Sequence, residues 1–196
     1  MSSAGRRTTV RTVAVRTPRL RLDVQYAVAA TTLPTAAALR RWARAALGRD
    51  ARVAIRFVGE REGRALNDRY RGQDHATNVL TFVYDEVDLL AGDLVLCAPV
   101  LRREAKAQGK PLPDHCAHLV VHGMLHLQGL DHDTERKARR MESREAAILA
   151  TFGIADPYAP AYAGAGHDKP AKAGSGHRRP AKAGAGHRPP ARAAAR

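Results

Sequence analysis

The sequence predicts an α+β fold, a single mixed-sheet domain packed with helices and zincin-like in type, between two basic tails. Short runs of alternating apolar residues, typical of half-buried strands, are interspersed with helical segments, and helices gather toward the end of the domain. The charge is unevenly spread. Of the formal net charge of +14, residues 1–20 carry +5, residues 161–196 carry +7 and the stretch between them only +2. We therefore expect a folded domain over 20–160 with disordered basic extensions at 1–19 and 161–196.

Each element of the domain has its own signal in the sequence. Strands are expected over 20–28, 53–57, 79–84 and 93–97, and helices between 34 and 48, over 60–69, from 99 to 109, over 115–127 and between 133 and 153. Asp114 and Asp133 are expected to cap the last two helices, because a carboxylate accepts from the free N–H groups of a first turn. The last helix places Met141, Ile148 and Phe152 on one apolar stripe.

The C-terminal tail is a ten-residue repeat that cannot form a core. From Ala163 it runs AGAGHDKPAK, AGSGHRRPAK and AGAGHRPPAR, in which alanine is the only apolar side chain. Such a segment cannot offset its ordering entropy by burial and is predicted to be disordered. Two interpretations stay open: a polycation that strengthens binding to RNA or the ribosome, or an extension without a dedicated role. The repeated histidines are isolated and are poor candidates for a metal site.

Several classes of protein are disfavoured by the sequence. No stretch approaches the 18 consecutive apolar residues that a membrane-spanning helix needs. No apolar core of signal-peptide length follows Arg6 and Arg7. Residues 1–19 share the composition of organelle transit peptides, although a basic extension or a start codon placed too far upstream is preferred. The two cysteines, Cys97 and Cys116, form no disulfide framework, so we expect a reduced, cytoplasmic protein.

The informative motif is the segment 122–132, which reads HGMLHLQGLDH. His122 and His126 are four residues apart, so they lie on one helix face and can direct their rings at a common point. Gly129 allows the chain to leave the helix in a left-handed conformation, after which His132 can reach the same point. Three imidazoles at about 2.0–2.1 Å with an open fourth position describe a catalytic zinc site. The sequence therefore predicts one zinc ion held by these three histidines.

Two neighbouring residues compete for a ligand role. His118 lies one turn before His122 on a similar face and is interpreted as a residue behind the ligands or in the substrate cleft. Cys116 is interpreted as a small buried apolar residue. The same His-x-x-x-His-x-x-Gly-x-x-His spacing occurs in metzincin peptidases, which have a glutamate base after the first histidine, whereas this chain has Gly123. A metallopeptidase is therefore an unfavoured alternative.

With two further motifs, this segment resembles the YbeY family of bacterial metal-dependent endoribonucleases and rRNA maturation factors. These motifs are NDRYRGQDHATNVLTF over 67–82 and GDLVLC over 92–97. The resemblance runs from about Arg52 to Tyr158, more weakly from Leu20, with Thr81 where serine is usual. It implies a single-strand-specific zinc endoribonuclease involved in 16S rRNA 3′-end maturation and late-stage 70S ribosome quality control. The implied partners are single-stranded RNA, rRNA and the small ribosomal subunit, with no DNA or membrane partner.

The resemblance also implies the site residues. His122, His126 and His132 match the zinc ligands of the family, and Arg71 matches the arginine of its active cleft. A guanidinium fork can hold two phosphate oxygens as charge builds up in the transition state. The nucleophile stays open between water and the 2′-hydroxyl of the RNA. Asp74, Asp131 and Asp133 are candidates for orienting a ligand histidine or moving a proton; a non-catalytic, zinc-stabilised ribosome assembly factor remains the alternative function.

Overall fold

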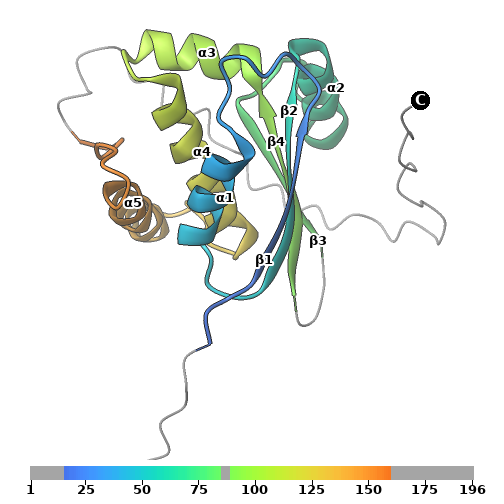
Figure 1. Ribbon diagram of the computed structural model, residues 1–196. Coiled ribbons are helices and arrows are strands. Elements are labelled where there is room, and N and C mark those ends of the chain that lie inside the picture. Colours follow the sequence, from blue (N-terminus) through green and yellow to red (C-terminus); the bar gives the residue numbers. More distant parts are fainter. Residues whose placement is uncertain (1–15, 85–88, 160–196) are drawn as a thin grey trace, which may run out of the picture.

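The computed structural model describes residues 16–84 and 89–159, and these form a four-stranded mixed sheet with five α-helices (Figure 1). The strands are β1 (Leu20–Tyr26), β2 (Ala51–Val58), β3 (Val79–Tyr84) and β4 (Leu90–Cys97), and the helices are α1 (Ala36–Ala45), α2 (Glu60–Arg71), α3 (Ala98–Ala107), α4 (Leu112–Leu127) and α5 (Glu135–Ala150). The α+β class and the single mixed sheet are confirmed. The predicted basic tails lie outside the described residues except for 16–19, so their disorder stays a prediction.

The sheet has the order β1-β2-β4-β3, and its register aligns the apolar residues of neighbouring strands. β1, β2 and β4 are parallel, with Ile55 paired to Val24 on one side and to Leu94 on the other. β3 runs antiparallel to β4 at the edge of the sheet. Because alternate side chains of a strand point to opposite faces, this register places continuous apolar rows on one face.

Two apolar clusters cover the two faces of the sheet. The larger cluster joins the sheet residues Ile55, Phe57 and Leu94 to side chains of α1, α4 and α5. The smaller one joins Val58 and Val95 to residues on the side of α2, and Figure 1 shows α2 on the opposite side of the sheet from α4. The histidine-bearing helix therefore lies on the main core, against the centre of the sheet.

Two predicted helix caps are wrong, by three residues at α4 and by one residue at α5. α4 begins at Leu112 after Pro111, and Asp114 lies in its first turn instead of capping it. Proline is tolerated at the start of a helix, where its missing N–H has no partner to lose, so the helix extends back through this segment. At α5 the cap is Thr134, whose hydroxyl accepts from Lys137 N, while Asp133 pairs with the Lys137 ammonium. Near a helix start, adjacent polar residues compete for the same N–H groups.

Candidate metal centre

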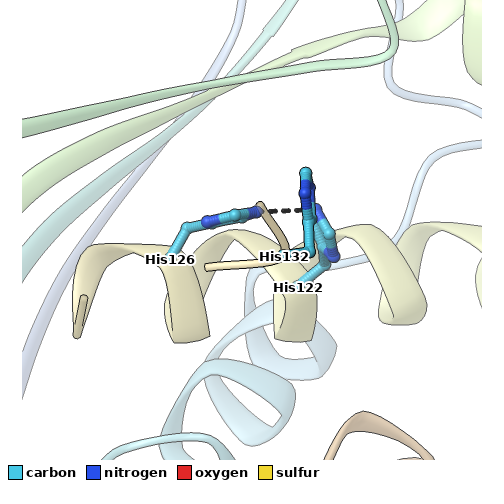
Figure 2. A group of neighbouring side chains, drawn as sticks. All are labelled: His122, His126 and His132. Atoms are coloured by element: carbon cyan, nitrogen blue, oxygen red, sulfur yellow. Dashed lines mark hydrogen bonds between the residues drawn. The ribbon is translucent and has the colours of Figure 1, made fainter. Parts of the chain in front are cut away.

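Helix α4 and the turn after it bring the three predicted histidines together (Figure 2). His122 and His126 have ring centroids 4.5 Å apart, and the ring of His132 lies 5.0 Å from that of His126. Gly129 has a φ of +81°, which is the left-handed conformation expected of it. There the backbone N–H of Gly129 donates to His126 O and that of Leu130 to Leu125 O. This helix end redirects the chain so that His132 faces the helical pair.

The spacing of the ring nitrogens fits a single cation. Each of the three histidines offers a nitrogen within 4.8 Å of the other two, and Nε2 of His122 lies 3.1 Å from Nε2 of His126. Nitrogens bound to one tetrahedral zinc ion at about 2.0–2.1 Å lie roughly 3.3 Å from one another. A modest adjustment of the His132 ring would therefore complete a three-nitrogen site. All three rings are partly exposed, so solvent or a substrate can reach the fourth position.

The surroundings of His126 favour its neutral, ligand-competent form. Burial, together with the neighbouring His122 and His132, lowers the pKa of His126 to about 4. A histidine must be deprotonated to bind a metal ion. At neutral pH His126 is therefore already in the state that a cation requires.

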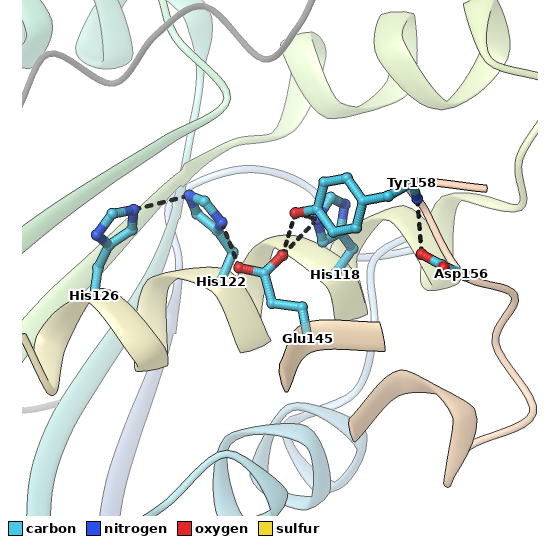
Figure 3. A network of polar contacts seen from close by, with 6 residues as sticks. All are labelled: His118, His122, His126, Glu145, Asp156 and Tyr158. Atoms are coloured by element: carbon cyan, nitrogen blue, oxygen red, sulfur yellow. Dashed lines mark hydrogen bonds and ion pairs between the residues drawn. The ribbon is translucent and has the colours of Figure 1, made fainter. Parts of the chain in front are cut away.

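A buried carboxylate stands behind the histidines, and the sequence had not pointed to it (Figure 3). Glu145 of α5 is 0% exposed; its Oε1 accepts from His122 Nδ1 at 2.8 Å and its Oε2 from His118 Nε2 at 3.1 Å. The Tyr158 hydroxyl also donates to Oε2. Glu145 lies four residues from both Met141 and Leu149, the other buried residues of α5. A charged residue in register with an apolar stripe is the signal that could have revealed it.

The three aspartates proposed for orienting a ligand histidine make other contacts in the described part of the chain. Asp74 pairs with Arg64 at 2.5 Å, with both side chains largely exposed. Asp133 pairs with Lys137, and Asp131 accepts from the backbone N of His132 at 2.7 Å. Asp131 therefore shapes the turn that carries a histidine without contacting the ring. Cys116 is fully buried, as expected.

Arg71 is on a different element from the histidines. It is the last residue of α2, followed by Gly72 in the left-handed conformation, and its side chain is half-buried. Burial lowers the pKa of Arg71, although a guanidinium remains protonated at neutral pH. Within the described ranges, its side chain has no hydrogen bond or ion pair. The chain leads from Arg71 through a loop into β3, the edge strand that packs against α4.

Gly123, the residue that replaces the peptidase glutamate, has a steric reason to be glycine. A Cβ atom at this position would lie 2.6 Å from Cδ2 of Leu94, a fully buried residue of β4. Contacts that short force a shift of packed side chains. The first helical turn of the histidine motif is therefore packed too closely against the sheet to hold a glutamate base.

The fold and the histidine cluster define a class of proteins, the α+β domains with a candidate three-histidine metal site. The family profile described as Endoribonuclease YbeY matches residues 25–153. Endoribonuclease YbeY of Aromatoleum aromaticum is 60% identical over 144 residues, covering 72% of this chain and 94% of the relative. Endoribonuclease YbeY of Thiobacillus denitrificans is 55% identical, covering 72% and 97%.

The chain belongs to the YbeY endoribonuclease family, whose members are hydrolases acting on RNA. The resemblance found in the sequence and the enzyme class are thereby confirmed. A solution structure of a Thermotoga maritima protein is 23% identical, covers 71% of this chain and 99% of its own, and has a TM-score of 0.47. None of the helices in the described part of the chain has the length and apolarity to span a membrane.

Proposed function

We propose that this chain is a zinc-dependent, single-strand-specific endoribonuclease that acts in 16S rRNA 3′-end maturation and late-stage 70S ribosome quality control, in the cytoplasm. The observation that carries the proposal is the convergence of His122, His126 and His132 within 4.8 Å, in a chain of the YbeY family. The domain proposed to do this work is 20–160, with the basic tails at 1–19 and 161–196 outside it.

The three histidines would hold one zinc ion through their ring nitrogens and leave a ligand position open. Bound there, zinc supplies Lewis acidity toward a phosphoryl oxygen and lowers the pKa of a bound water to about 7. Neutral imidazoles are the proper ligands for this ion, and the low pKa of His126 supports that state. Nickel and copper would bind the same three nitrogens at least as well in vitro, so the metal present in the cell needs direct measurement.

Arg71 is the proposed phosphate-binding residue. Its charge has no carboxylate partner in the described part of the chain, and its half-buried position strengthens attraction to an anion. A guanidinium fork can hold two non-bridging oxygens of the phosphodiester and favour the additional charge of the transition state. An RNA strand that contacts both Arg71 and the histidines would cross the edge strand β3.

The test compares four full-length proteins prepared in parallel: wild type, His122→Ala, Arg71→Glu and Arg61→Glu. Wild type should contain about one zinc per chain and cleave an unstructured, end-labelled RNA, and a chelator should stop the cleavage. His122→Ala should lose both properties, whereas Arg71→Glu should keep zinc and cleave about 100-fold more slowly or worse, as for other residues that stabilise transition-state charge. Arg61→Glu makes the same charge change at an exposed position of α2 and should cleave normally.

Equal cleavage by wild type and His122→Ala would contradict the proposal, because a contaminating nuclease would then be the source. End-group analysis of the products separates the two open routes. A 2′,3′-cyclic phosphate would show attack by the 2′-hydroxyl of the RNA, and a linear phosphate as the first product would show attack by water. The role in rRNA maturation is tested by 16S rRNA 3′ ends in cells that carry only the Arg71→Glu chain, where unprocessed ends should accumulate.

A further inference from the structure

The carboxylate of Glu145 lies at the centre of a closed polar network between α4, α5 and the segment that follows α5 (Figure 3). One oxygen accepts from His122 and the other from His118 and Tyr158. Nε2 of His118 also lies 3.1 Å from the Tyr158 hydroxyl. The side chain of Glu145 is 0% exposed, so bulk solvent does not reach the carboxylate.

The hydrogen bonds of this network determine which ring nitrogen of His122 carries the proton. Three groups that can donate converge on the two oxygens of Glu145: the rings of His118 and His122 and the Tyr158 hydroxyl. Both carboxylate oxygens therefore act as acceptors in this network. In neutral His122 the hydrogen bond to Glu145 then places the proton on Nδ1 and leaves the lone pair on Nε2. That nitrogen is the one that faces Nε2 of His126 at 3.1 Å.

We propose that Glu145 is a positioning residue that fixes His122 as an Nε2 ligand, and that Tyr158 and His118 hold the carboxylate in the orientation this requires. The inference rests on the proposed metal site, because it assigns the residue behind one of its ligands. A carboxylate that accepts from the far nitrogen of a ligating histidine sets both the tautomer and the angle of the ring. Glu145 also makes the proposed ligand more basic, which strengthens its bond to a cation.

A competing arrangement uses the same residues. His118, His122 and Glu145 offer ligand atoms within 4.8 Å of one another and could hold an ion themselves. Both oxygens of Glu145 are already engaged by three donors, and Glu145 is fully buried, so such an ion would displace the network and have no open position for a substrate. The positioning role keeps every hydrogen bond intact and leaves the exposed side of the histidines free.

The chain offers a matched control for the test. Glu104 of α3 accepts from Nε2 of His115 at 2.8 Å, so it also holds a histidine of α4, but away from the three-histidine cluster. In full-length Glu145→Gln and Glu104→Gln, zinc affinity is measured by competition with a chromophoric chelator. We expect Glu145→Gln to bind zinc about 10–100-fold more weakly than wild type. Glu104→Gln should bind within about 3-fold of wild type, and the tail histidines are the same in all three proteins.

A second measurement needs no variant and no metal. The tautomer of His122 in the metal-free wild type is read from the ¹⁵N chemical shifts of its ring, and we expect the proton on Nδ1. A protonated Nε2 would overturn the proposal, and so would wild-type zinc affinity in Glu145→Gln. If Glu145→Gln does not fold, Tyr158→Phe replaces it and should shift the affinity by a smaller factor in the same direction.

The outcomes separate this inference from the proposed function. If wild type binds no zinc or cleaves no RNA, the proposed function fails, whatever the tautomer of His122. If wild type binds zinc and Glu145→Gln binds it equally well, only the positioning role fails. If Glu145→Gln abolishes binding and His126→Ala retains it, the ion occupies the His118, His122 and Glu145 group, and the positioning role is overturned.

Discussion

Helix α4 packs one face against the sheet and presents another to α5 and solvent, and the two faces are stabilised in different ways. On the packed face, a Cβ atom at Gly123 would meet Leu94 at 2.6 Å. On the histidine face, His118 and His122 are held by hydrogen bonds to one carboxylate from the next helix. The packed face fixes where the helix lies, and the histidine face fixes which ring atoms point outward.

This division explains how a site with precise geometry can remain open. Ligand rings must hold their positions to within a fraction of an ångström, which rigid support from secondary-structure elements provides. The contact between the sheet and α4 supplies that support, through fully buried residues such as Leu94 of β4 and Met124 of α4. The histidine rings are therefore free to stay partly exposed without losing their orientation.

The largest expected effect comes from adding atoms to the packed face. In Gly123→Glu, a side chain and a charge would be forced against buried Leu94, so we expect a loss of about 3 kcal/mol or more in the free energy of unfolding. For a domain of this size that loss lowers the midpoint of thermal unfolding by roughly 10 °C. The added glutamate should produce no peptidase activity, because the packing gives it no space beside the histidines.

The control for this variant is Ala147→Glu, which places the same side chain at an exposed position of α5. It should change the unfolding midpoint by no more than about 2 °C, as surface substitutions usually do. If Gly123→Glu were as stable as wild type, the close contact between α4 and β4 would not exist in solution. Peptide hydrolysis by a folded Gly123→Glu would reopen the metallopeptidase alternative.

The next largest expected effect is a loss of bound zinc, caused by a substitution on the histidine face that leaves the fold intact. His132→Gln removes one of the three converging nitrogens, and we expect the purified protein to retain well below one tenth of the zinc bound by wild type after dialysis. His118→Gln removes a histidine of similar burial that lies behind the ligands, and it should keep about one zinc per chain. Metal analysis of the two proteins, with circular dichroism to verify folding, makes the comparison.

The opposite result would assign the metal ion to a different group of residues. If His118→Gln lost its zinc and His132→Gln kept it, the ion would sit between His118, His122 and Glu145. The histidine face would then hold the metal at its buried end, away from solvent. Retention of zinc by both variants would point to binding elsewhere in the chain.

The parts of the site that were predictable from the sequence are those determined by local geometry. His122 and His126 are related by one helical turn, and Gly129 and His132 follow within six residues, so the convergence needs no knowledge of the rest of the fold. The positions of the first two strands followed from alternation for the same reason. Arg71 was proposed from family resemblance, and nothing in its local pattern separates it from the other arginines of α2.

Glu145 could not be placed because its role depends on tertiary packing. It lies more than twenty residues after the first ligand histidine, on a helix whose orientation toward α4 is fixed by core contacts such as that of Met141. The sequence pointed to aspartates instead, yet Asp74 and Asp133 pair with residues of opposite charge at the surface. The antiparallel position of β3 at the sheet edge was likewise not predictable, because it depends on which strands pair in the folded chain.

The smallest expected effect is on cysteine reactivity, which reports whether α4 separates from the sheet in the native protein. Cys116 lies on the packed face of α4 and Cys97 ends β4, and both are at most 1% exposed. Burial raises the pKa of Cys116 to about 12 and also raises the pKa of Cys97. Only the thiolate is nucleophilic, so neither cysteine should react with a thiol reagent in the native protein at neutral pH.

The control is Ser143→Cys, which places a thiol at an exposed position of α5 and should react within seconds to minutes. In denaturant, labelling of the two native cysteines should follow the unfolding transition, because Cys116 is buried in the main core under α4 and Cys97 in the smaller cluster on the α2 side of the sheet. Labelling of Cys116 in the native state at a rate close to that of Ser143→Cys would show that α4 detaches from the sheet without global unfolding. The histidine rings would then lose their rigid support, and the contrast between the two faces of α4 would not hold in solution.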